Sequence, residues 1–82
     1  MIHELKTWPE YFMAIARGYK TFEIRKNDRG FKTGDILWLK KYDPQVGYMG
    51  MGLQKRVDYI LYGPAFGIEE GYCVMSLKSI EP

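Results

Sequence analysis

The chain has 82 residues, of which 46% are hydrophobic and 16% aromatic, and its formal net charge is +2. This composition excludes an intrinsically disordered chain, and the length fits one small domain with a single core over residues 1–82. The net charge is too small to indicate a nucleic-acid-binding protein by itself. Its distribution is uneven, because residues 1–42 carry nine Lys or Arg against five acids and residues 43–82 carry three against five. The basic half can orient an anionic partner.

Cys73 is the only cysteine, so the chain cannot form an internal disulfide. It lies in an apolar strand pattern and is expected to be a buried structural thiol, which makes a reducing, cytoplasmic setting the default. No apolar run reaches the roughly 20 residues that a membrane-spanning helix needs, and residues 1–6 have no signal-peptide pattern. We expect no membrane contact, no metal and no cofactor, and the sequence leaves the oligomeric state open.

The first predicted elements are a short strand over residues 3–7 and a helix that follows it. Thr7 and Glu10 have the spacing of a capping box, and Pro9 is tolerated in the first turn of a helix. Gly18 is expected to end this helix after about three turns. The side chains expected on its buried face are Trp8, Phe12, Ile15 and Ala16.

Residues 20–26 alternate in the manner of a half-buried strand. Phe22 and Ile24 are expected to face the core. Thr21, Glu23 and Arg25 form the opposite face, with Lys20 at the start of the strand. Several hydrogen-bonding side chains on one face can bind a phosphate or a base edge, so the polar face predicts a binding cleft.

The remaining chain predicts three further strands joined by turns. Residues 27–30 form a turn with Phe31 in the core beneath it, and residues 33–35 form a second tight turn. The strands are expected over residues 36–39, 57–62 and 72–77, separated by a mobile glycine-containing loop at 47–52 and a second loop at 63–71. The predicted fold is α+β but mostly β, a partly closed barrel of about five strands with one short helix across its mouth.

One pattern in the chain resembles a known family. Gly18, Lys20, Glu23 and Arg25, followed by Gly34-Asp35, resemble the motif of the ASCH domain family in the PUA-like superfamily. With residues 3–7 and the basic run at 25–29, nearly the whole chain is similar to a small bacterial and phage branch of that family, itself of unknown function. The resemblance implies a five- or six-stranded barrel with an RNA-binding cleft between helix and barrel. Lys20, Glu23 and Arg25 would line this cleft.

The leading hypothesis is therefore a non-enzymatic module that binds RNA or a modified nucleotide. Lys20 and Arg25 would hold phosphate, while Glu23 and Asn27 would discriminate a base. The further candidate binding residues are Arg29, Lys6 and His3, and Tyr19 and Tyr72 are candidates for base stacking.

Two alternatives stay open. A small bacterial relative in the resembled group is an amidohydrolase that removes an acyl group from a modified cytidine with a lysine, a threonine and a glutamate. Here Lys20 would be the nucleophile or base and Glu23, which stands at the threonine position, a proton carrier, with Glu69 or Glu70 as the distant glutamate. The second alternative is a protein-interaction domain with a patch formed by Tyr48, Met49 and Met51.

Overall fold

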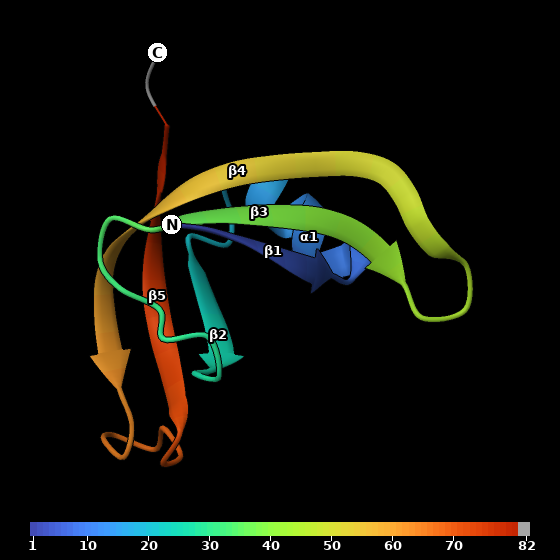
Figure 1. The fold of residues 1–82 in the computed structure, drawn as a ribbon. Coiled ribbons are helices and arrows are strands. Elements are labelled where there is room, and N and C mark those ends of the chain that lie inside the picture. Colours follow the sequence, from blue (N-terminus) through green and yellow to red (C-terminus); the bar gives the residue numbers. More distant parts are fainter. Residues whose placement is uncertain (81–82) are drawn as a thin grey trace.

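The structure is a computed structural model that describes residues 1–80 and holds one short helix and five strands in that range. The elements in chain order are β1 (Ile2–Thr7), α1 (Pro9–Ala16), β2 (Phe22–Lys26), β3 (Ile36–Asp43), β4 (Gly47–Tyr62) and β5 (Tyr72–Ser79). The strands form one mixed sheet in the order β1-β3-β4-β5-β2 that curves into a half-barrel (Figure 1). β1 runs parallel to β3, and the other pairs are antiparallel. The predicted mostly-β fold is confirmed.

The core lies inside the curve of the sheet. Burial alternates along β1, with His3, Leu5 and Thr7 pointing inward, as expected for a strand with one solvated face. The hydrophobic core consists of Leu5, Phe12, Ile15, Phe31, Leu37, Leu39, Val57, Ile60, Cys73 and Met75. The buried positions of Phe31 and Cys73 were predicted correctly. The strand that begins at residue 36 is interior to the sheet, because β3 lies between β1 and β4.

The barrel is open between β1 and β2, which are the two edges of the sheet. Arginine side chains span this opening. Arg25 donates from Nη2 to the carbonyl oxygen of Lys6 at 2.9 Å, and Arg29 donates from Nη1 to that of Glu4 at 2.7 Å. Guanidinium groups thus satisfy edge carbonyls that a sixth strand would otherwise pair, and they protect the edge of β1 from other strands.

The predicted start of the helix is wrong. Trp8, not Thr7, is the N-cap, and no side chain caps the first turn. Thr7 belongs to β1 and points inward, where its hydroxyl lies 3.5 Å from the carbonyl oxygen of Leu5. The helix has eight residues, shorter than three turns, and only Phe12 and Ile15 are buried, whereas Trp8 and Ala16 are exposed.

The predicted orientation of β2 is also wrong, although its alternation is as expected. Phe22 and Ile24 are 41% and 55% exposed, while Glu23 is 4% exposed. The inner face of β2 borders the opening of the half-barrel instead of a closed core, so ionic side chains that bridge this opening occupy it. The apolar side chains lie on the outer face.

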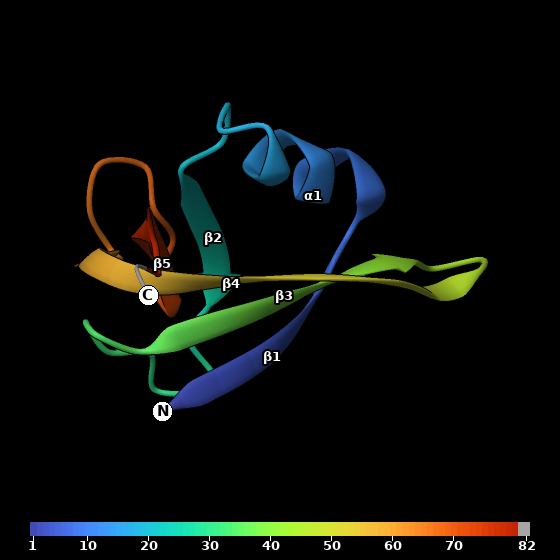
Figure 2. The same cartoon turned by 90° about the horizontal axis from the view of Figure 1, so that it is seen from above.

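The glycines at 47, 50 and 52 do not form the predicted loop. They belong to β4, which begins at Gly47 and is far longer than the predicted strand at 57–62. A three-residue turn at 44–46 joins it to β3, and the β3–β4 hairpin projects beyond the rest of the sheet (Figures 1 and 2). Ile80, which follows β5, is 39% exposed.

Candidate ligand-binding cleft

A cleft of about 560 Å³ opens between α1, the free edge of β2 and the end of β1. Figure 2 shows α1 above the sheet, beside the start of β2. The residues that line the cleft are Lys6, Thr7, Trp8, Tyr11, Lys20, Phe22, Glu23, Ile24 and Arg25. Its size is within the range of pockets that hold a small ligand such as one nucleotide, about 300–1,000 Å³.

The ionic wall of the cleft is centred on the buried carboxylate of Glu23. Its Oε1 accepts from Lys20 Nζ at 2.8 Å and its Oε2 accepts from Arg25 Nε at 2.7 Å. The Glu23 side chain is only 5% exposed, and those of Lys20 and Arg25 are 19% and 26% exposed. A carboxylate this deeply buried needs compensating charge, and the two cations supply it on both oxygens.

The two cations keep hydrogen-bonding capacity for a ligand. Lys20 has three N–H donors, of which one contacts Glu23 and one the carbonyl oxygen of Phe22 at 2.9 Å. Arg25 has five, of which one contacts Glu23 and one the carbonyl oxygen of Lys6. One donor on Lys20 and three on Arg25 therefore have no partner among the described residues. Because Glu23 and the backbone contacts fix both side chains, these donors are held in place before any ligand arrives.

The opposite wall of the cleft is aromatic. Trp8 and Tyr11 stack with ring centroids 6.4 Å apart and planes inclined by 20°. They are 54% and 45% exposed, so each ring has a free surface. Lys20 Nζ lies 5.8 Å from the ring centroid of Tyr11 and 5.1 Å from that of Phe22. The cleft thus places flat apolar surfaces next to cationic donors.

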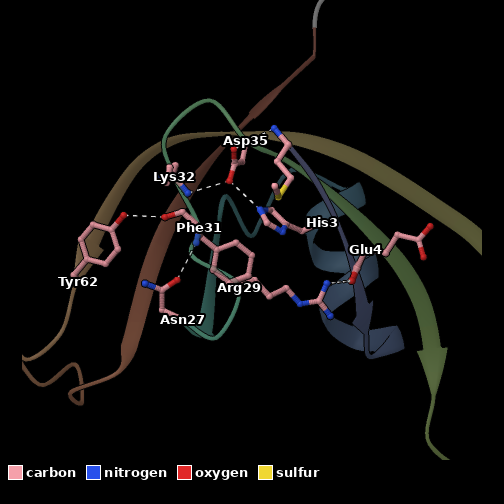
Figure 3. A network of polar contacts seen from close by, with 9 residues as sticks. His3, Glu4, Asn27, Arg29, Phe31, Lys32, Asp35 and Tyr62 are labelled. Carbon is pink, nitrogen blue, oxygen red and sulfur yellow. Dashed lines mark hydrogen bonds and ion pairs between the residues drawn. The ribbon is translucent and has the colours of Figure 1, made fainter.

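The predicted binding residues His3 and Asn27 do not line the cleft. His3 is buried, its Nε2 lies 2.8 Å from Asp35 Oδ2, and its ring packs edge-on against Phe31 at 4.8 Å (Figure 3). The side-chain oxygen of Asn27 accepts from the backbone N–H of Phe31 at 2.9 Å. Both side chains are occupied by contacts that fix the turn and the loop after β2.

Asp35 is the centre of this second polar network. It accepts from His3, from the backbone N–H of Lys32 at 3.0 Å and from the N-terminal ammonium at 3.3 Å. Burial alone would raise the pKa of the Asp35 carboxyl, but the hydrogen bonds from His3, Lys32 and the N-terminus outweigh it, and the pKa is lowered. This network ties β1 to the loop that precedes β3, and it does not reach the cleft.

Of the other predicted residues, only Lys6 lines the cleft. Arg29 bridges to β1 and does not line the cleft, whereas Lys6 lines it. Tyr19 and Tyr72 are 82% and 37% exposed but do not line it. Glu69 and Glu70 are exposed in the loop between β4 and β5 and do not line it either.

The sequence did not identify the aromatic wall as part of the site. Trp8 was expected in the core, and Tyr11 was not among the predicted site residues. The useful signal is Pro9, because a proline in the first turn places the preceding residue outside the helix, on the surface of the strand-to-helix junction. Tyr11 follows Trp8 by three positions and so lies on the same side of the chain.

Within residues 1–80, no three His, Cys, Asp or Glu side chains are arranged so that they could hold a metal ion. The same part of the chain contains no helix long and apolar enough to cross a membrane. Burial raises the pKa of the Cys73 thiol, as expected for a structural cysteine.

The fold and the cleft together define a small β-rich domain, an open half-barrel with an ionic and aromatic cleft beside its helix. The family model described as "Domain of unknown function (DUF3850)" matches residues 2–77, so the chain belongs to this family. The chain is also 36% identical, over 56 residues, to a protein of Escherichia phage P2 named "Uncharacterized 12.9 kDa protein in GpA 3'region". The match covers 68% of this chain and 50% of the phage protein, so the chain spans about half the length of this curated relative.

Proposed function

We propose that this chain binds RNA or a modified nucleotide in the cleft between α1 and β2, as its resemblance to ASCH domains of the PUA-like superfamily implies. The observation that carries the proposal is the set of unpartnered N–H donors on Lys20 and Arg25, opposite the exposed rings of Trp8 and Tyr11. A nucleotide offers both matching parts, a phosphate that accepts hydrogen bonds and a flat base that stacks.

The proposal gives different roles to the three ionic residues. Lys20 and Arg25 bind the phosphate, because their free donors and net positive charge favour an anion. Glu23 is a positioning residue, since both of its oxygens already accept from the cations and its side chain is almost fully buried. Base discrimination, which the sequence suggested for Glu23 and Asn27, is not assigned to them here, because Glu23 accepts from both cations and Asn27 does not line the cleft.

The hydrolase alternative is not supported by any contact of Lys20. Its Nζ donates to Glu23 Oε1 at 2.8 Å and to the carbonyl oxygen of Phe22 at 2.9 Å. Both contacts use the nitrogen as a hydrogen-bond donor, whereas a nucleophile or base needs a nitrogen lone pair directed at the substrate.

A salt-dependent binding experiment tests the proposal. A fluorescein-labelled ten-nucleotide oligouridine is titrated with protein at several salt concentrations, and its anisotropy is measured. Single-stranded RNA loses affinity with a log–log slope of about −0.7 for each neutralised phosphate. Lys20→Gln should weaken binding about tenfold and reduce the magnitude of the slope by about 0.7.

Lys78→Gln is the matched control. Lys78 lies on β5, contacts Asp58 at 3.8 Å and does not line the cleft. It removes the same charge, so its effect measures the contribution of net charge alone. Equal affinities for Lys20→Gln and Lys78→Gln would refute the proposed site.

A further inference from the structure

The outer face of β1, β3 and β4 carries a second basic and aromatic surface, here called the hairpin surface. Its members are Lys6, Trp38, Lys40, Tyr42 and Tyr48. Lys6 on β1 pairs with Lys40 on β3, and Tyr42 on β3 pairs with Tyr48 on β4. Directly paired residues of neighbouring strands project to the same side of a sheet, and the contacts of Lys6 with Tyr42 and of Lys40 with Tyr48 place both pairs on one face.

The hairpin surface is continuous with the cleft through Lys6, which lines the cleft and also contacts the hairpin. Lys6 Nζ lies 4.6 Å from the ring centroid of Tyr42, and Tyr42 packs against Tyr48 at 5.1 Å. Lys40 Nζ lies 4.3 Å from the ring of Trp38 and 5.8 Å from that of Tyr48. Cations and rings therefore form an unbroken series of contacts that leads away from the cleft, in the order Lys6, Tyr42, Tyr48, Lys40 and Trp38.

A hollow of about 260 Å³ lies at the far end of this series, lined by Trp38, Lys40, Tyr48 and Gly52 among others. Gly52 allows the indole of Trp38 to lie close over β4, because a Cβ at position 52 would be 2.8 Å from Trp38 Nε1. Tyr48 is 59% exposed. The hollow thus combines a flat indole, an exposed phenol ring and an ammonium.

We infer that the ligand is a single strand of RNA several nucleotides long, not an isolated nucleotide. One nucleotide occupies the cleft, and its neighbours cross Lys6 and Lys40 and stack on Tyr48 and Trp38. The distance from β1 to β4 is two strand spacings, about 10 Å, which a few nucleotides cover. This inference rests on the proposed function and names the substrate class of the same site.

The chemistry of the hairpin surface fits a strand of RNA. Base–aromatic stacking is stronger per ring than an exposed cation–π contact, so a base can displace a lysine from the face of its ring. The released ammonium then lies beside the ligand backbone and can bind phosphate. Glu4, the acid that contacts this surface, is paired with Lys40 at 3.4 Å, so its charge is already compensated.

The two tryptophans allow the two parts of the site to be observed separately, because Trp8 lines the cleft and Trp38 lines the hollow on the hairpin. Their indole N–H resonances are followed in ¹H–¹⁵N spectra during titration with uridine 5′-monophosphate or with hexauridylate. The mononucleotide should shift the Trp8 resonance alone. Hexauridylate should shift both and bind at least tenfold more tightly.

Tyr48→Ala should weaken hexauridylate binding about tenfold and leave the mononucleotide affinity unchanged, because one stacking surface is lost outside the cleft. The matched control is Tyr59→Ala, since Tyr59 also lies on β4, is 66% exposed and lines neither hollow. The same spectra show whether each variant is folded.

The possible failures are distinguishable. If hexauridylate binds no more tightly than the mononucleotide and leaves the Trp38 resonance unmoved, the extended site is wrong and the cleft proposal stands. If the mononucleotide shifts Trp38 as strongly as Trp8, the hairpin binds adventitiously and the inference is overturned. If neither ligand moves the Trp8 resonance, the proposed function fails and the inference with it.

Discussion

Replacement of Glu23 by glutamine is expected to destabilise the domain markedly. Glutamine keeps the size of the side chain and one acceptor oxygen, so it can accept from only one of the two cations. Its amide nitrogen, a donor, then faces the other cation at the position where Oε1 or Oε2 now accepts at 2.8 Å or 2.7 Å. One charge-assisted contact is lost, and the cation that made it must be hydrated by solvent instead.

The magnitude follows from the burial of the three side chains. A hydrogen bond to a charged group contributes about 1.5–3 kcal/mol. Lys20 and Arg25 are already 19% and 26% exposed, so a released cation regains part of its hydration. We therefore expect a loss of about 2 kcal/mol in the free energy of unfolding. For a domain of this size each kcal/mol lowers the melting temperature by about 4–8 °C, which gives a decrease of about 8–16 °C.

Thermal unfolding followed by circular dichroism at pH 7 measures this effect. The matched control is Glu4→Gln, because Glu4 is 56% exposed and contacts Lys40 only at 3.4 Å. An exposed pair of this kind contributes at most about 1 kcal/mol. If Glu23→Gln melts within 2 °C of Glu4→Gln, the buried carboxylate does not organise the cleft and the reasoning is refuted.

Three further predictions concern residues outside the ionic wall. Asp35→Asn should lower the free energy of unfolding by about 2 kcal/mol at pH 7. Because the pKa of Asp35 is lowered from its ordinary 3.8, the stabilisation by its carboxylate is complete above pH 3.8 and is lost as the pH falls further. Urea melts of variant and wild type should therefore converge only in that acidic range. Arg29→Gln should lower the free energy of unfolding by about 1 kcal/mol through the lost hydrogen bond to the carbonyl oxygen of Glu4, but leave RNA affinity unchanged. A loss of affinity as large as that of Lys20→Gln would contradict the placement of Arg29 outside the cleft. Gly52→Ala should displace the indole of Trp38 and alter its fluorescence, measured with Trp8 replaced by Phe; an unchanged emission spectrum would show that the indole does not lie over β4.

The alternation of residues 20–26 was sufficient to predict a strand with Lys20, Glu23 and Arg25 near one another, because this relation is local in the chain. It was not sufficient to predict which face is inside. The usual rule places apolar side chains inward, but the inner face of β2 meets the opening of the half-barrel and not a closed core. That opening depends on which strands fail to pair, and strand pairing is a long-range property.

The same limitation explains the errors at the helix and the hairpin. The Thr7–Glu10 spacing fits a capping box, but the pairing of β1 with β3 extends through Thr7 and turns its side chain inward. Gly47 and Gly52 disfavour a strand by propensity, yet their partners Asp43 and Lys40 hold them in the ladder. At these positions the pairing of distant strands determines the backbone conformation, and local sequence preference does not.

The central claim is that the free N–H donors of Lys20 and Arg25, whose side chains Glu23 holds in place, contact the ligand. The neighbouring side-chain Nε–H resonance of Arg25 tests this claim most directly. On titration of ¹⁵N-labelled protein with hexauridylate, this resonance and the backbone amides of residues 20–25 should shift together and saturate with one dissociation constant. Shifts confined to the network around His3 and Asp35, or to the loop at 63–71, would contradict the account.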